Sequence, residues 1–379
     1  MRVYLDNAAT TPLDREVLDA MTPMMLEHYG NPSSIHSHGR EVKAAIEKAR
    51  KAVSSLLNAS PSEIFFTSGG TEADNTALRC GIESLQLTHA ITSPTEHHAV
   101  LHTLEHLHKQ GKIALSFVEL DAKGHVVMEH LEELLRQHPR SMVSLMEANN
   151  EIANRTDITA VGSLCRQYDA VFHSDTVQSM GHYIHDLRTI PVDFIVGAAH
   201  KFHGPKGVGF LYINSDRKIQ PFIHGGAQER NMRGGTENVY GIVGLAKALE
   251  IAYRDMEAHR THIEGLKARM IEKLRTSIEE VAFNGDSANL GQSLYTVLNV
   301  SLPASDISDM LLFSLDIHKI SASGGSACSS GSNVGSHVLQ ALNCSPDRPS
   351  VRFSFSKYNT EAEVDFVVEK LSALYKQKV

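Results

Sequence analysis

The segment 192–213 reads Val192-Asp-Phe-Ile-Val-Gly-Ala-Ala-His-Lys-Phe-His-Gly-Pro-Lys-Gly-Val-Gly-Phe-Leu-Tyr-Ile213. Its apolar runs predict a buried strand over 193–198 and a second strand over 208–213. His200 and Lys201 lie in the tight polar turn between these strands. Burial disfavours the charged form of a lysine, and the neutral amine that results can form a Schiff base with an aldehyde. A surface lysine that reaches into solvent is an equally good interpretation of this segment alone.

Apolar runs and amphipathic stretches alternate on both sides of this segment. The periodicity predicts helices over 15–26, 41–57, 159–168, 239–258 and 262–279. It predicts further strands before the glycines at 69 and 70 and over 89–93, 113–120, 142–146 and 170–173. The alternation indicates an α/β fold with a large, mostly parallel sheet that helices cover on both faces. We expect a smaller α+β region to follow, with strands over 295–300 and 350–355 and a helix over 305–315.

The overall composition narrows the class of protein. A chain of 379 residues exceeds one simple core, so we expect two domains, or one large domain with a satellite. The net charge of −8 gives no reason to expect nucleic acid or an anionic membrane as a partner. No apolar run approaches membrane-spanning length and the first residues lack the apolar core of a signal peptide, so we expect a cytoplasmic protein.

Cysteine and histidine usage suggests no bound metal. The four cysteines, at positions 80, 165, 328 and 344, form no C-x-x-C pair, which suits a reducing compartment. The 22 histidines include no His/Cys set at the spacing of a zinc site, and most lie in surface-type helical runs. We therefore expect no metal centre.

A candidate anion cradle follows the strand that starts at Glu63. Gly69 and Gly70 precede a helix, and Thr71 supplies a hydroxyl beside its first backbone N–H groups. Such a helix start binds a small phosphate, whereas the sequence matches neither a dinucleotide nor a nucleoside triphosphate motif. A strand-to-helix turn with a threonine cap is about as good an interpretation of these residues.

Other polar groups are expected at the carboxyl ends of strands, where open α/β sheets bind ligands. His97 or His98 follows one strand, and Asn149 and Asn150 follow another. Asp175 comes at the end of an apolar strand, where a carboxylate is costly without a cationic partner. A pyridinium nitrogen would be such a partner, and a helix N-cap is the structural alternative.

The C-terminal region contains two further candidates. Cys328 lies in a run of glycine, serine and alanine, 320–335, which is unlike the usual buried cysteine and suits a reactive thiol. Arg352 alternates with apolar residues in the strand over 350–355. An inward-facing arginine suits recognition of a carboxylate, and a solvated arginine on an edge strand is the simpler alternative.

One cofactor accounts for most of these candidates. Pyridoxal 5′-phosphate (PLP) has an aldehyde for Lys201, a phosphate for Gly70 and Thr71, a pyridinium for Asp175 and a ring face for His97. The sequence therefore predicts a PLP site.

The chain closely resembles the cysteine desulfurases of the NifS/IscS-like group within the class V aminotransferases, from Leu5 to the strand at Arg352. The motifs that carry the resemblance are Leu5-Asp-Asn-Ala-Ala-Thr-Thr-Pro12, Thr67-Ser-Gly-Gly-Thr-Glu-Ala-Asp-Asn75, Thr95-Glu-His97, Asn149-Asn-Glu-Ile152, Asp175-x-x-Gln178, His200-Lys201, Arg233-Gly-Gly-Thr-Glu-Asn238 and Gly325-Ser-Ala-Cys328. It implies the PLP-dependent transferase fold-type I, with a large PLP domain over 15–258 and a small domain of 1–14 and 259–379 that carries the cysteine loop.

The resemblance also implies a role for each matching residue. Lys201 forms the Schiff base, His97 stacks on the ring, Asp175 pairs with the pyridinium, and Cys328 is the nucleophile. The further implied contacts are Asn150 and Gln178 beside the ring, Gly70, Thr71 and His200 on the phosphate, Thr236 on the phosphate from the other subunit of a homodimer, and Arg352 with Asn150 at the substrate. Ala198 replaces the serine that usually binds the phosphate.

The activity implied is removal of sulfur from L-cysteine, which gives L-alanine and a persulfide on Cys328. The persulfide would pass to an acceptor protein, for which an iron–sulfur scaffold is one candidate, in the synthesis of iron–sulfur clusters or other sulfur-containing cofactors or tRNA. A selenocysteine lyase or another class V PLP enzyme is the alternative. A catalytically silent sulfur carrier with the same fold is a second alternative, from a different functional class.

Overall fold

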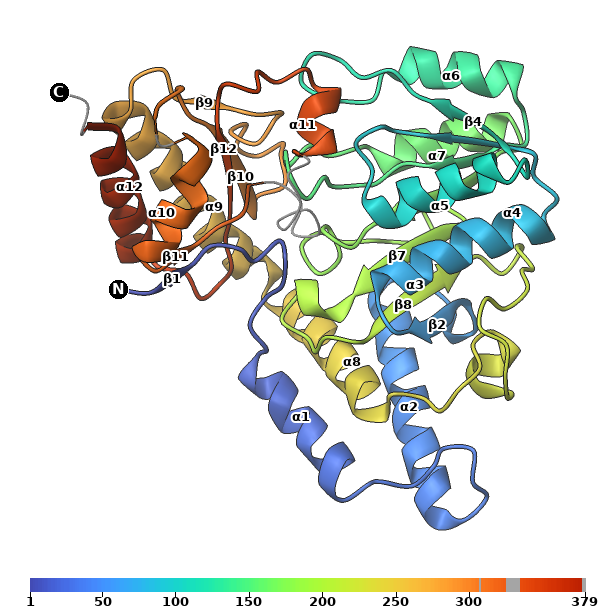
Figure 1. Cartoon of the computed structure of the whole chain (residues 1–379). Helices are drawn as coiled ribbons and strands as arrows, with labels where there is room; N and C mark the ends of the chain where they lie inside the picture. Colours follow the sequence, from blue (N-terminus) through green and yellow to red (C-terminus); the bar gives the residue numbers. More distant parts are fainter. Residues whose placement is uncertain (307, 325–334, 377–379) are drawn as a thin grey trace.

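The computed structural model describes residues 1–306, 308–324 and 335–376 (Figure 1). A seven-stranded sheet forms its centre, with the strand order β2-β8-β7-β6-β5-β3-β4. These strands are β2 (Ile64–Thr67), β3 (His89–Thr92), β4 (Ala114–Phe117), β5 (Met142–Ser144), β6 (Val171–Asp175), β7 (Phe194–Ala198) and β8 (Gly209–Ile213). Strand β8 runs antiparallel to both of its neighbours, β2 and β7, and all the other pairs of neighbouring strands are parallel. The expectation of a mostly parallel sheet is therefore confirmed.

Two apolar clusters cover the two faces of this sheet. In β7, Ile195 packs into one cluster, whereas Phe194 and Val196 pack into the other. Successive side chains of a strand point to opposite faces, so a strand covered on both sides is apolar throughout. The surrounding helices are α1 (Arg15–Leu26), α2 (Ser37–Leu56), α3 (Gly70–Asn75), α4 (Gly81–Ser84), α5 (His98–Lys109), α6 (Met128–Gln137), α7 (Ile158–Gln167) and α8 (Val239–Arg254). A π-helical turn, Thr76–Cys80, joins α3 to α4.

The remaining elements form a second packed region. Its strands are β1 (Val3–Tyr4), β9 (Ala282–Phe283), β10 (Val297–Ser301), β11 (Ile320–Ser321) and β12 (Ser350–Ser354). Its helices are α9 (Met256–Ser277), α10 (Leu311–Ile317), α11 (His337–Ala341) and α12 (Glu361–Lys376). The N-terminal strand β1 pairs with β11, and Val3 and Leu5 belong to the apolar core of this region. The division into 15–258 and 1–14 with 259–379 stays a prediction, which this packing supports.

Several element bounds differ from the predicted ones. Helix α2 begins at Ser37 rather than at residue 41, because the His36 side chain caps it by accepting from Gly39 N. The predicted break between residues 258 and 262 is wrong, since α9 already begins at Met256 and α8 ends at Arg254. The backbone N–H of His259 donates to Asp255 O, so the polar residues 259–261 continue the helix.

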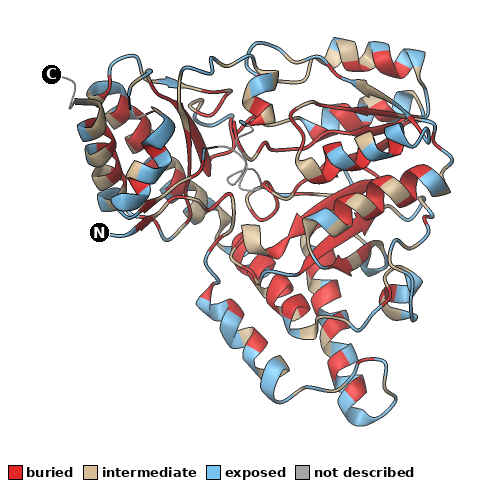
Figure 2. Ribbon diagram, viewed as in Figure 1, coloured by how far each residue is buried: buried red, intermediate tan, exposed pale blue. Residues whose placement is uncertain are grey.

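Figure 2 shows which residues are buried and which are exposed. The strands of the central sheet are largely buried, whereas the outer faces of α1 and α2 are exposed. Among the described residues, we find no helix long and apolar enough to span a bilayer.

Candidate active site

A cavity of about 210 Å³ lies at the carboxyl ends of β6 and β7, where the strands of an open α/β sheet present ligand-binding groups. It brings together nine of the residues that the sequence singled out. These are Gly70, Thr71, His97, Asn150, Asp175, Gln178, His200, Lys201 and Arg352. Ala8 and Ala9 of the N-terminal segment also line it.

Lys201 lies in the helical turn that follows β7, with its side chain half-buried at the cavity. Its Nζ donates hydrogen bonds to Ala8 O at 2.5 Å and to Ala9 O at 3.0 Å. Thr11 N donates to His200 O at 2.9 Å and anchors the N-terminal segment over the turn. The amine is therefore directed into the cavity, and the interpretation as a lysine that reaches into solvent is wrong.

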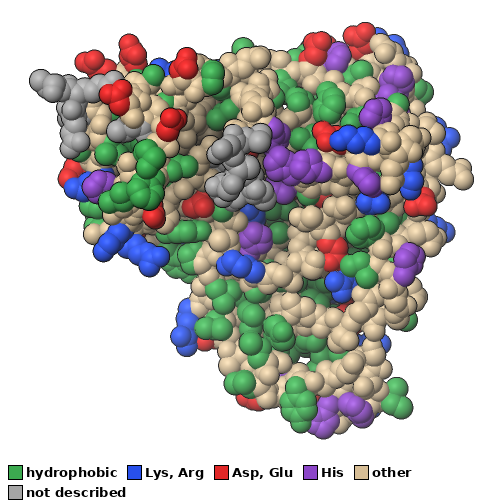
Figure 3. Space-filling model, viewed as in Figure 1, with side chains coloured by type: hydrophobic (Ala, Val, Ile, Leu, Met, Phe, Trp, Pro, Cys, Tyr) green, Lys and Arg blue, Asp and Glu red, His purple; other side chains and the backbone are tan. Residues whose placement is uncertain are grey.

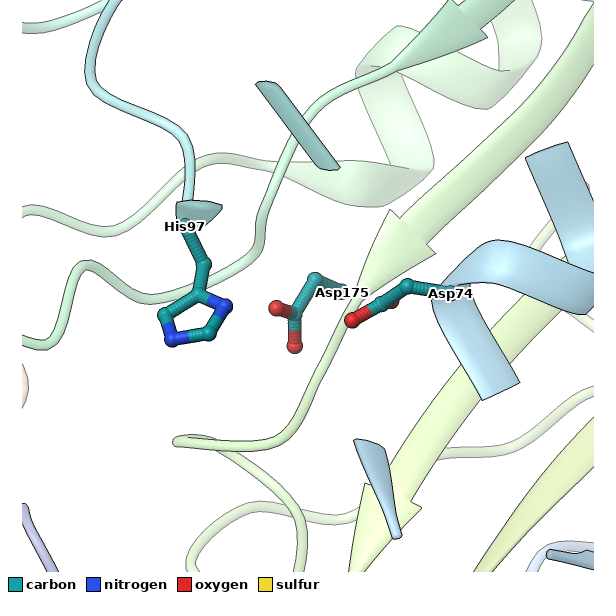
Figure 4. A group of neighbouring side chains, drawn as sticks. All are labelled: Asp74, His97 and Asp175. Atoms are coloured by element: carbon teal, nitrogen blue, oxygen red, sulfur yellow. The ribbon is translucent and has the colours of Figure 1, made fainter. Parts of the chain in front are cut away.

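Asp175 and His97 face each other across the cavity (Figure 4). Asp175 ends β6 and is buried, and its Oδ1 accepts a hydrogen bond from Val177 N at 2.9 Å. His97 caps α5, and its Nδ1 accepts from Ala99 N at 3.1 Å. Burial lowers the pKa of His97, opposed by the charge of Asp175. The neutral ring then carries its proton on Nε2, since Nδ1 is an acceptor.

The start of α3 forms the opposite wall. Gly69 has φ +154°, which other residues rarely adopt. A Cβ added to Gly70 would lie 2.9 Å from Val177 Cγ2, so the cavity wall excludes a side chain there. Arg233 Nε pairs with Glu72 at 3.0 Å, and Glu72 accepts from Ser68 N, which fixes this turn. The first backbone N–H groups of the helix are therefore available to an anion.

His200 and Gln178 complete the wall near Lys201. Burial, with a smaller effect of Lys201, lowers the pKa of His200 to about 4, so its imidazole is neutral at pH 7. His200 Nδ1 lies 3.2 Å from Thr10 Oγ1, and Gln178 Nε2 donates to Ala8 O at 3.0 Å. Both side chains thus contact the N-terminal segment as well as the cavity.

Arg352 is buried although β12 is an edge strand of its sheet. Its Nη1 donates to Asn150 O at 3.0 Å and its Nη2 pairs with Asp6 Oδ1 at 2.9 Å. Its Nε is buried and has no hydrogen-bond partner among residues 1–306, 308–324 and 335–376. The interpretation as a solvated edge arginine is wrong, because Ser323 covers the backbone of this strand. An incompletely bonded guanidinium suits an incoming carboxylate.

Thr236 and Cys328, two of the predicted site residues, are not among the described residues that line this cavity. Thr236 lines a separate cavity of about 140 Å³ together with Ser68 and Arg233. Cys328 lies outside the described residues. Both flanks of its segment are close to the cavity: Ser323 pairs with the backbone of Arg352, and Ser336 Oγ donates to Glu151 Oε2 at 2.5 Å.

The sequence reading missed three acidic side chains at or near this cavity: Asp6, Asp74 and Glu96. Asp74 could have been found, because helical spacing places residues 70, 71 and 74 on one face. Asp6 has no such signal, since its partner Arg352 lies 346 residues away.

The residues present fit PLP. The cavity offers an amine, a carboxylate, an imidazole and a helix start to one ligand, and these match its aldehyde, ring nitrogen, ring face and phosphate. Arg352 Nε, which is buried and has no hydrogen-bond partner among the described residues, indicates that a further polar group is expected beside this guanidinium.

Comparisons with known proteins agree with this geometry. The family model described as aminotransferase class-V matches residues 3–367. The chain is 40% identical to the cysteine desulfurase IscS of Dictyoglomus turgidum over 99% of this chain and 97% of that protein. It is 42% identical to the cysteine desulfurase IscS of Methanosarcina thermophila over 97% and 90%.

Solved structures give the same result. A structure described as a NifS-like protein superposes with a TM-score of 0.90 at 37% identity, over 99% of this chain and all of that one. A structure of SspA in complex with cysteine superposes with a TM-score of 0.80 at 30% identity, over 95% and 100%. The chain therefore belongs to the class V aminotransferase family, within its NifS/IscS-like group of PLP-dependent enzymes.

Proposed function

We propose that this protein is a cysteine desulfurase, which converts L-cysteine to L-alanine and retains the sulfur as a persulfide on Cys328. The observation that carries the proposal is the convergence of Lys201, Asp175 and His97 on one cavity that the incompletely bonded Arg352 also lines. The full-length similarity to cysteine desulfurases supports it.

Arg352 binds the carboxylate of the substrate. Asn150 O holds Nη1, and Asp6 holds Nη2, so the guanidinium is fixed in orientation before the substrate arrives. Fixing a bidentate donor in this way lowers the entropic cost of binding.

Lys201 and His97 move protons around the substrate. Lys201 Nζ reaches the cavity from the β7 end, and the neutral His97 ring faces it with a protonated Nε2. When bound, PLP supplies the aldehyde that links to an amine and the ring that accepts electrons from the substrate carbon. Asp175 would hold a negative charge against the ring nitrogen, while Gly70, Thr71 and His200, which line the same cavity, would hold the phosphate.

Cys328 takes the sulfur. Its thiolate attacks the sulfur of the substrate, so that an S–S bond forms and the C–S bond breaks with its electron pair left on carbon. Protonation of that carbon yields alanine, and the outer sulfur passes to an acceptor protein. Iron–sulfur cluster assembly is the pathway that we favour for this sulfur.

The active unit is a homodimer in which Thr236 serves the cavity of the partner subunit. Within one chain Thr236 lines a different cavity, beside Arg233. Apolar residues are exposed near the tip formed by α1 and the start of α2 (Figure 3): Leu26 is 72%, Tyr29 75% and Ile35 91% exposed. A second copy of the chain would cover them.

The test is alanine formation from L-cysteine by the PLP-loaded protein, with and without a thiol reductant. We expect Cys328→Ala to lose the activity while it keeps the absorption of bound PLP, and Lys201→Ala to lose both. Cys344→Ala is the matched control, because Cys344 is a half-buried thiol outside the cavity. Equal activity of wild type and Cys328→Ala would contradict the persulfide step. Selenocysteine turned over without cysteine turnover would favour the lyase.

A further inference from the structure

Asp74 is a buried carboxyl group that none of the roles above uses. It lies on α3, one turn after Gly70, and lines the same cavity. It is 1% exposed, and its Oδ1 has no hydrogen-bond partner in the part of the chain that the structure describes. A π-helical turn begins two residues later, and such turns often occur at functional sites.

Asp74 faces Asp175 (Figure 4). A carboxylate oxygen of each residue and a ring nitrogen of His97 all lie within 4.8 Å of one another. Two carboxylates this close in a buried site do not both ionise, because each charge opposes the other. Asp175 is the better stabilised of the two as an anion, since Val177 N donates a hydrogen bond to its Oδ1.

Two further titratable groups near Asp74, Glu96 and His173, give it no compensating positive charge, whereas Lys201 and Arg352 line the same cavity. Glu96 is a third buried acid, whose Oε1 accepts from Met146 N at 2.6 Å. Burial, Asp175 and Glu96 together raise the pKa of Asp74 well above its ordinary value. His173, on β6, is fully buried, and burial lowers its pKa to about 3, so it is neutral.

His173 lies next to Asp74, although the described residues show no hydrogen bond between the two side chains. Its Nδ1 lies 2.8 Å from Ser144 Oγ, and its Nε2 lies 3.3 Å from Asp74 Oδ1. Because the His173 ring is neutral, it gives Asp74 no compensating positive charge. The second oxygen of Asp74 can then carry a proton toward Asp175.

We propose that Asp74 is a protonated positioning residue, whose hydroxyl donates a hydrogen bond to Asp175 and so fixes the carboxylate that pairs with the ring nitrogen of PLP. The link to PLP rests on the proposed function, whereas the protonation state of Asp74 does not.

The first test is infrared difference spectroscopy of wild type against Asp74→Asn, on the cofactor-free and the PLP-loaded chain. We expect the variant to lose a carboxylic-acid carbonyl band in both forms. Loss of a carboxylate band instead would overturn the proposal. Because the cofactor-free chain gives this readout by itself, a failure of PLP to bind wild type would overturn the proposed function without affecting this result.

The second test is the dissociation constant of PLP, together with its absorption spectrum when bound. Asparagine keeps a donor toward Asp175, so Asp74→Asn should bind PLP within about threefold of wild type and keep the spectrum. Asp74→Ala removes the donor and should weaken binding about tenfold, as expected for one hydrogen bond to a charged group. If Asp74→Ala behaves as wild type, or Asp74→Asn loses as much as Asp74→Ala, the proposal is wrong.

Asp193→Asn is the matched control. Asp193 is an equally buried carboxylate that pairs with Arg166 and Arg217 and does not line the cavity. It should lower thermal stability without a change in the spectrum or the PLP affinity. A spectral change in this control equal to that of Asp74→Ala would show that the effect is general destabilisation.

Discussion

Arg50 and Arg352 are two of the largest fully buried side chains among the described residues, and they differ in how completely they are bonded. Arg50 Nη1 and Nη2 pair with both oxygens of Glu229 at 2.7 and 2.8 Å, and its Nε donates to Glu47. Arg352 lines the cavity, and its buried Nε has no partner among the described residues.

This difference separates two uses of a buried charge. A guanidinium whose donors are all satisfied fixes the packing of segments, here α2 against β2 and the loop at Glu229. A guanidinium beside a cavity that has a donor without a partner can still form a hydrogen bond to a ligand. The comparison therefore predicts stability effects at Arg50 and binding effects at Arg352.

The largest expected effect is on stability, from Arg50→Met. Removal of the cation leaves Glu229 buried and uncompensated, so the free energy of unfolding should fall by about 3–5 kcal/mol. Denaturant unfolding measures this. The double variant Arg50→Met/Glu229→Met should recover much of the loss, because an apolar pair leaves no buried charge. An Arg50 variant with normal stability but a raised KM would contradict the assignment of a purely structural role to Arg50.

The next largest effect is a dependence of stability on pH, which we expect from the buried His173. Burial lowers its pKa from 6.5 to about 3, so it is neutral in both folded and unfolded chains above pH 6.5. As the pH falls below 6.5 the unfolded chain takes up the proton first, and stability is lost by about 3 kcal/mol down to pH 4. His173→Asn should flatten this slope in unfolding measurements at several pH values, and an unchanged slope would contradict the assignment.

Arg352→Gln should act on the substrate rather than on the fold. Loss of a charged hydrogen-bond donor costs about 1.5–3 kcal/mol, so kcat/KM for L-cysteine should fall by roughly 10- to 150-fold. Arg352→Lys is the control that keeps the charge but loses the planar fork. A stability loss as large as that of Arg50→Met, with normal kinetics, would reverse the two roles.

The smallest effect is expected at Asp6, whose side chain is 22% exposed. Asparagine keeps an oxygen that can accept from Arg352 Nη2 but removes the charge that repels the substrate carboxylate, so Asp6→Asn should lower the KM for L-cysteine about threefold, or about 0.6 kcal/mol. Steady-state kinetics at low salt measure this best, because salt screens the repulsion. A raised KM would mean that Asp6 acts mainly by orienting the guanidinium.

Much of the fold was predictable from local patterns. The apolar runs that became β6, β7 and β8 are buried on both faces, so their composition alone identified them as strands of a covered sheet. Helix ends were less predictable, because they depend on caps such as His36 and on polar residues that continue a helix, as at His259.

The sequence by itself determined the candidate site around Lys201, His97 and Asp175. These residues follow strands, and the carboxyl ends of parallel strands meet at one edge of a sheet, so chain order was enough to bring them together.

Only the tertiary structure decided how the buried charges are bonded. The pairs Arg352–Asp6 and Arg50–Glu229 join segments 346 and 179 residues apart, and no local periodicity encodes such contacts. Whether a donor such as Arg352 Nε is satisfied depends on the position of every neighbouring atom. Sequence pattern determines which residue types reach the site, whereas packing determines which of them still have bonding capacity for a ligand.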